Sequence, residues 1–167
     1  MKISMHAMSH DVFKKYLTQL LHVMEKGVAN AKARGFETSV LVNARLAPDM
    51  LPFYKQIQLT SDFAKNSMAR LAGIDPPKFE DNESTMEELV ARVKKTLEFI
   101  STVPAAALEG SETRDIKIPL RDRTLEMQGL PFLQNWALAN FFFHHVTAYN
   151  ILRHNGVDIG KRDFLGG

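Results

Sequence analysis

The sequence of 167 residues contains no cysteine, and this absence excludes several kinds of chemistry. Without cysteine the chain can form no disulfide, no thiolate zinc site and no cysteine nucleophile. It also lacks an apolar run long enough to cross a membrane, because the longest run, 137–143, is interrupted by Asn140. No hydrophobic segment typical of a signal peptide follows Met1, so we expect a cytoplasmic protein with no membrane partner.

A strong excess of charge of either sign is also missing. The 21 basic residues nearly balance the 19 acidic residues, which argues against a surface dedicated to nucleic acid. Basic and acidic residues are interspersed, as on solvated helix faces. Neither a glycine-rich phosphate loop nor a nucleophile elbow occurs. What remains is a composition with 45% hydrophobic residues, enough for a core, in a length typical of one domain, 1–167.

Two early segments carry apolar residues at steps of three and four, which predicts two amphipathic helices. The first covers about 13–31, with Ser4 or Ser9 as its N-cap and a stop at Gly35. The second covers about 50–71, with Asp49 as its N-cap and a stop at Gly73.

A third helix, 86–100, has the clearest start, because Ser84 with Glu87 and Thr85 with Glu88 both fit a capping box. Alternating apolar residues over 115–127 then predict a small hairpin. A last helix extends from about 131 to 155 and is apolar almost all round, as in a helix buried on several sides or in a subunit interface. We expect an all-α protein, an antiparallel four-helix bundle with a small β-hairpin between helices 3 and 4, followed by an extended tail, 157–167.

Polar residues on the most apolar helix suggest a site. Asn140, His144 and Thr147 share one face of the last helix, and their burial without partners would cost a few kcal/mol each. Gln58 and Asp62 have the same spacing on the second helix. A contact between Asp62 and His144 would orient the imidazole and fix its tautomer, as in a general base. The alternative is a satisfied polar network that only fixes helix register.

The histidines do not assemble a recognisable metal site. His6 and His10 have helical spacing, but they lie near a chain end, and two ligands do not make a site. His144 and His145 are adjacent, so on a helix they point about 100° apart and cannot share one ion. We therefore predict no cofactor and no metal site; the alternative is a divalent metal ion, for which His144 is the only weak candidate ligand.

Several segments are similar to one family of unknown function. In the first half they are 45–50 (RLAPDM), 56–58 (QIQ), 61–65 (SDFAK) and 69–73 (ARLAG). In the second half they are 140–144 (NFFFH), 147–149 (TAY), 151–157 (ILRHNGV) and 160–166 (GKRDFLG). Across essentially the whole chain, the sequence resembles domain-of-unknown-function (DUF) family 1993, a bacterial branch of the DinB/YfiT-like superfamily.

The resemblance implies a DinB-like four-helix bundle with a small strand pair between the third and fourth helices. Many relatives in the superfamily bind a divalent ion through one histidine of the second helix and a His-x-x-x-His pair of the last, and some are thiol-dependent transferases or isomerases. This chain has Gln56 and Gln58 but no histidine in the second helix, lacks the pair, and carries Asn30 where the family often has histidine. His144 matches the family's histidine after the aromatic run.

Two hypotheses about function follow. In the first, the chain is a small-molecule binder or an enzyme with a polar pocket between helices 2 and 4, His144 being the base, Asp62 its orienting partner and Tyr149 a hydrogen-bond donor. The residues of this pocket are Gln58, Asp62, Asn140, His144, Thr147 and Tyr149. In the second, it is a non-catalytic structural or interaction bundle that forms a homodimer through its apolar last helix. The sequence predicts no reaction for either.

Overall fold

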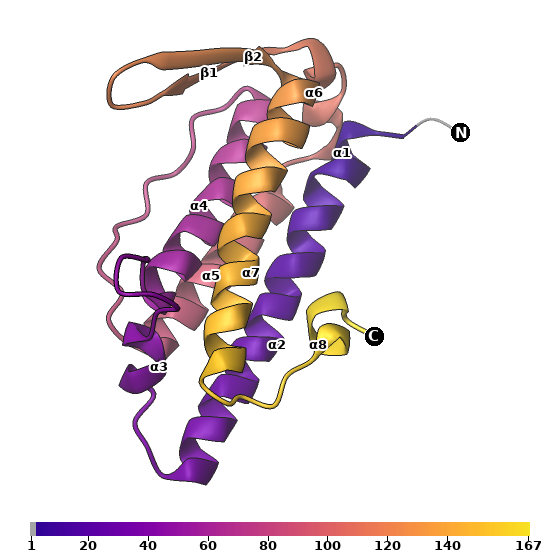
Figure 1. Ribbon diagram of the computed structural model, residues 1–167. Helices are drawn as coiled ribbons and strands as arrows, with labels where there is room; N and C mark the ends of the chain where they lie inside the picture. Colours follow the sequence, from indigo (N-terminus) through magenta and orange to yellow (C-terminus); the bar gives the residue numbers. More distant parts are fainter. Residues whose placement is uncertain (1–2) are drawn as a thin grey trace.

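The computed structural model describes residues 3–167 and contains four long helices (Figure 1). These are α2 (His10–Arg34), α4 (Phe53–Ala72), α5 (Met86–Thr102) and α7 (Leu138–His154). The shorter elements are α1 (Met5–Met8), α3 (Ser39–Asn43), η1 (Ala105–Leu108), η2 (Ser111–Thr113), β1 (Asp115–Pro119), β2 (Thr124–Gln128), α6 (Gly129–Phe132), η3 (Leu133–Ala137) and α8 (Lys161–Leu165). None of the helices in 3–167 has the length and apolar character needed to span a membrane.

The predicted bundle with its hairpin between the third and fourth long helices is confirmed, and the helix directions refine it. In Figure 1, α2 and α7 run away from the hairpin, whereas α4 and α5 both run towards it. The parallel direction of α4 and α5 requires the crossover, residues 74–85, to return along the bundle. Lys55 and Gln58 of α4 accordingly contact Asp81 and Glu83 of the crossover, at 3.3 and 2.8 Å.

Local signals set several helix ends. Gly35 and Gly73 both have a φ of 72° and close α2 and α4 in the left-handed conformation that glycine adopts most readily. Thr85 and Glu88 form the predicted capping box of α5. Asp49 is not the cap of α4, because the helix begins at Phe53 and Pro52, with an extended backbone, is its N-cap.

The core lies between the four long helices and is sealed by the hairpin. Its largest fully buried side chains include Phe13 of α2, Phe53 of α4 and Phe141 of α7. Ile116 and Ile118 of β1 are also buried, so one face of the two-stranded sheet covers the end of the bundle. A ribbon of two strands has little stability in isolation, and this packing supplies it.

The last predicted helix is divided by a π-helical segment, Leu133–Ala137, between α6 and α7. Periodicity did not indicate this segment, because one wider turn inside an apolar helix leaves the composition unchanged. The helix is also not covered on all sides, since Phe143 is 63% exposed.

The prediction of an extended tail over 157–167 is wrong for its second half, because Lys161–Leu165 forms α8. Val157 and Ile159 are buried, and α8 packs against α2 (Figure 1). Asp163 fixes the contact by accepting hydrogen bonds from His22 and Lys26 of α2. Glycine and charge therefore mark a closing turn and an ion pair here, not a free segment.

Candidate functional site

His144 of α7 lies at the contact between α4 and α7. Its Nδ1 atom is 2.8 Å from Oε1 of Gln56, an almost completely buried residue of α4. The imidazole ring stacks on Phe63 with a centroid distance of 5.7 Å and an angle of 12° between the planes. Phe143 contacts the same ring edge-on. One amide and two aromatic rings thus hold the orientation of His144.

The Gln56 amide determines which nitrogen of His144 carries the proton. Its Nε2 donates to the Leu51 carbonyl at 2.9 Å, so its Oε1 is the atom that faces the imidazole. A carbonyl oxygen only accepts, and Nδ1 of His144 must therefore be the donor. Burial lowers the pKa of His144, which keeps the ring neutral near pH 7. The Nε2 lone pair is then free to accept a proton, a hydrogen bond or a cation.

The predicted contact between Asp62 and His144 is absent from the described residues. Asp62 instead accepts from Arg92 of α5 at 3.0 Å and pairs with Lys65 at 3.1 Å. Gln58 donates to Glu83 of the crossover. The physical reason is the helical rotation of about 100° per residue, which places Gln58 on the opposite side of α4 from Gln56. The prediction that Gln58 faces α7 is therefore wrong, and Gln56 is the glutamine that contacts this helix.

Asn140 and Thr147 share the predicted face with His144 but satisfy their polar groups within α7. Asn140 donates to the Trp136 carbonyl at 2.8 Å, and Thr147 donates to the Phe143 carbonyl at 2.6 Å. Bonds of this kind to the preceding turn are common for short polar side chains in helices. Tyr149 lies on a different face of α7 and contacts Phe164 of the tail. Of the six predicted residues, only His144 therefore lies in the α4–α7 contact with a side-chain partner on α4.

A pocket of about 230 Å³ lies between α4, the hairpin and the start of the last helix, and His144 is not among its lining residues. Asp62, Phe63 and Arg70 line it together with Trp136. Phe63 therefore contributes both to the pocket wall and to the stack on His144. Burial lowers the pKa of Arg70, yet its guanidinium remains charged at neutral pH.

His145 occupies a different environment from its neighbour. It is 1% exposed, and its Nε2 donates to the Tyr16 carbonyl at 2.9 Å. Burial lowers its pKa to about 4, although the hydrogen bond to Tyr16 opposes part of the shift. The surrounding groups are the aromatic rings of Tyr16, Phe141 and Phe164. His145 is therefore a neutral core residue.

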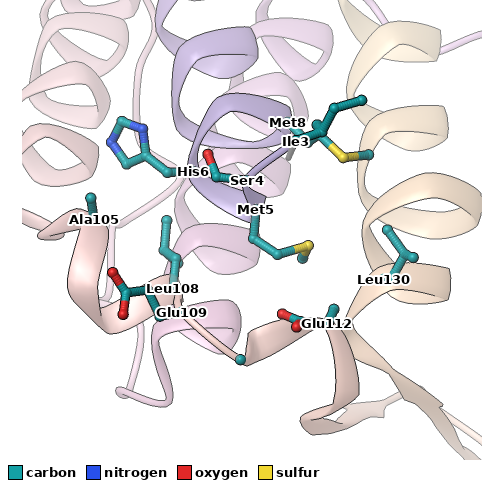
Figure 2. Close-up of a pocket in the computed structure, with 11 residues that line it drawn as sticks. Ile3, Ser4, Met5, His6, Met8, Ala105, Leu108, Glu109, Glu112 and Leu130 are labelled. Atoms are coloured by element: carbon teal, nitrogen blue, oxygen red, sulfur yellow. The ribbon is translucent and has the colours of Figure 1, made fainter. Parts of the chain in front are cut away.

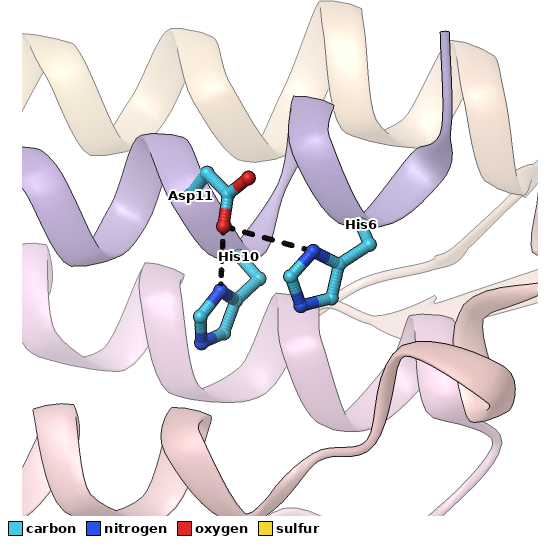
Figure 3. Close-up of side chains that lie close together, drawn as sticks. All are labelled: His6, His10 and Asp11. Carbon is cyan, nitrogen blue, oxygen red and sulfur yellow. Dashed lines mark hydrogen bonds and ion pairs between the residues drawn. The ribbon is translucent and has the colours of Figure 1, made fainter. Parts of the chain in front are cut away.

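A second cluster lies near the N-terminus, where the sequence predicted only a pair of histidines. His6, His10 and Asp11 each offer one ligand atom, and these atoms lie within 4.8 Å of one another (Figure 3). The predicted pair depended on histidine spacing alone and did not include Asp11. The signal that could have identified Asp11 is its position next to His10 in the sequence.

Comparison with known proteins agrees with the fold. A solved structure of a DinB family member from Shewanella denitrificans superimposes with a TM-score of 0.91 and 35% sequence identity, covering 97% of this chain and 92% of that one. No curated protein matches the sequence significantly. Residues 5–165 match the family described as a domain of unknown function (DUF1993). The chain therefore belongs to the DUF1993 family and has the DinB-like helical-bundle fold that its sequence resembles.

Proposed function

We propose that this chain is a small-molecule-binding DinB-like protein whose ligand contacts Nε2 of His144. The observation that carries the proposal is the 2.8 Å bond between Nδ1 of His144 and Oε1 of Gln56. It fixes one tautomer of a neutral imidazole and leaves the other nitrogen without a hydrogen bond in the described residues. Enzymes and binding proteins prepare histidine in this way when it acts as a base or a ligand atom.

The surroundings of His144 limit what the ligand is. Phe63 and Phe143 give the imidazole apolar walls, so the ligand group that reaches Nε2 is partly shielded from water. The adjacent pocket is about 230 Å³, smaller than the roughly 300–1,000 Å³ of pockets for drug-sized ligands. Arg70 in its wall offers a positive charge, whereas the Asp62 carboxylate is already paired with Arg92 and Lys65. These features favour a small polar molecule with an acidic N–H or O–H group.

The first test compares two histidine variants of the same helix. A library of small polar compounds is screened by ligand-observed NMR against the wild type, His144→Ala and the control His154→Ala, whose side chain is exposed. Compounds that bind the wild type and the control should lose binding to His144→Ala. Binding that survives in His144→Ala would contradict the proposal.

A second test addresses the tautomer directly. Nitrogen-15 NMR of the histidine rings should show His144 neutral and protonated at Nδ1 at pH 7. The change Gln56→Leu removes the acceptor and should shift the ring towards a mixture of tautomers. A predominantly Nε2-protonated ring in the wild type would contradict the role assigned to Gln56.

The homodimer is a second candidate, favoured by one specific observation. Phe143 and Val146 of α7 are 63% and 37% exposed, and both point away from the core. Large apolar side chains on one helix face are typical of interfaces between subunits. Sedimentation velocity at micromolar concentration should show a dimer for the wild type and a monomer for Phe143→Ser. A wild-type monomer would contradict this candidate and leave the His144 proposal standing.

A further inference from the structure

The junction of α1 and α2 brings two histidines and a carboxylate together (Figure 3). The His6 and His10 rings stack with a centroid distance of 4.4 Å and an angle of 24°. Oδ1 of Asp11 lies 2.9 Å from Nδ1 of His10 and 3.6 Å from Nδ1 of His6. These contacts link both rings to one carboxylate oxygen.

A break in the helix makes this arrangement possible. In a continuous helix, Asp11 would point about 140° away from His6, so the two could not meet. Ser9 interrupts the helix with φ −114° and ψ −74°, and its hydroxyl donates to the Met5 carbonyl at 2.7 Å. The break changes the direction of the first turn of α2 relative to α1 and brings Asp11 towards His6.

We propose that His6, His10 and Asp11 form a binding site for a divalent transition-metal ion such as Zn²⁺. Imidazole nitrogen and carboxylate oxygen are ligands that such ions prefer, and two histidines with one carboxylate are a recurrent set in open sites. Ligand atoms about 2.0–2.1 Å from a tetrahedral ion are about 3.3 Å apart. The 2.9 and 3.6 Å separations found here fall on either side of that value.

A large pocket adjoins the proposed site, and His6 belongs to both. The pocket has a volume of about 690 Å³ and lies between α1, η1 and the start of the last helix (Figure 2). Glu109 and Glu112 contribute carboxylates to its wall, and Met5 and Leu108 contribute apolar surface. Three protein ligands leave at least one position on a tetrahedral ion open. That position would be available to water or to a ligand entering from the pocket.

The chain supplies its own control for a purely structural histidine–aspartate contact. Nε2 of His22 lies 2.9 Å from Oδ1 of Asp163, as close as His10 lies to Asp11. Nζ of Lys26 contacts the same oxygen at 2.9 Å, so an ammonium group already neutralises that carboxylate. Removal of His22 should therefore leave metal binding unchanged.

The experiment is a calorimetric titration of Zn²⁺ into protein without a histidine tag, previously stripped with a chelator. We expect one ion per wild-type chain. His6→Ala and His10→Ala should each weaken binding by at least about tenfold, since loss of a direct ligand should exceed the cost of losing an outer-shell partner. His22→Ala should match the wild type. Co²⁺ should give the visible absorption of a tetrahedral site in the wild type and lose it in the first two variants.

Circular dichroism checks that each variant keeps its helices, and Asp11→Asn serves as a third variant because that side chain is exposed. The proposal is overturned if the wild type binds no stoichiometric Zn²⁺, or if affinity is equal in the His6, His10 and Asp11 variants and the wild type. It is also overturned if His144→Ala abolishes Zn²⁺ binding while His6→Ala does not. That result would place the ion at the α4–α7 contact.

Discussion

At the residue scale, adjacent histidines have opposite roles because their surroundings differ. His144 keeps a free nitrogen at the edge of the bundle, whereas His145 is enclosed by aromatic rings and bonded to a backbone carbonyl. Sequence adjacency alone separates their directions by about 100°. The different chemistry of the two imidazoles follows from the groups that surround each ring.

The depressed pKa of His145 makes a prediction about stability against pH. In the folded state His145 is protonated only below about pH 4, whereas a histidine in the unfolded state is protonated below about pH 6.5. The unfolded state therefore binds more protons in this window, and stability falls as pH falls through it. We expect a loss of about 2 kcal/mol between pH 7 and pH 5 from this group.

Urea unfolding at both pH values measures this effect. His145→Gln retains a donor for Tyr16 but does not titrate, so its free energy of unfolding should change less with pH than that of the wild type. His154→Gln, at an exposed position, should retain the wild-type dependence. Equal pH dependence in all three proteins would show that His145 is not the responsible group.

At the element scale, a single arginine connects α5, α4 and the crossover. Arg92 is 3% exposed and contacts carboxylates of Asp62, Asp81 and Glu83 at 2.8–3.0 Å. Its guanidinium also donates to the Glu80 carbonyl. The crossover contains little regular structure of its own, so these bonds hold it against the parallel pair of helices.

Arg92→Met should therefore destabilise the protein by about 2 kcal/mol. This is less than the cost of breaking a fully buried ion pair, because Asp62 and Asp81 keep contact with water. Hydrogen exchange over 74–85 should become faster than in the wild type. Lys55→Met removes a more exposed pair with Asp81 and should cost less than about 1 kcal/mol. A similar loss for both variants would contradict the central role of Arg92.

The junction of the hairpin and α6 depends on one glycine. A Cβ atom at Gly129 would overlap the backbone carbonyl oxygen of Ser111, and backbone cannot move aside as a flexible side chain can. Gly129→Ala should cost more than about 2 kcal/mol in chemical unfolding. Gly160→Ala, where a Cβ meets nothing within 4 Å, should change stability by less than about 1 kcal/mol. Equal stability of the two variants would contradict this packing.

At the scale of the whole molecule, the C-terminal tail closes the structure by packing α8 on α2, far away in sequence. Asp163 accepts from His22, Lys26 and the Gly160 amide. The hydrogen bond from Lys26, followed by that from Gly160, holds the pKa of Asp163 well below its usual range. The charged contact therefore persists at mildly acidic pH and weakens only as the carboxylate gains a proton.

Asp163→Asn should lower the protection of residues 157–166 from hydrogen exchange at pH 7 while leaving the four long helices protected. The neutral amide loses the charge-assisted bonds, which are about twice as strong as neutral ones. Asp158→Asn is the matched control, because Asp158 is exposed in the same tail. Unchanged protection in Asp163→Asn would indicate that apolar contacts of Phe164 alone retain α8.

The sequence by itself determined the four long helices, several of their ends and the hairpin. These features depend on local rules, such as the glycine ends at Gly35 and Gly73, the capping box at Thr85 and the alternation over 115–127. Only the tertiary structure decided which polar groups meet. Helix rotation selected Gln56 over Gln58 as the partner of His144, and the break at Ser9 brought Asp11 to His6. Periodicity specifies which residues share one face of a helix or strand. Contacts between elements depend on helix breaks, crossovers and helix directions, and these can differ among sequences with the same periodicity.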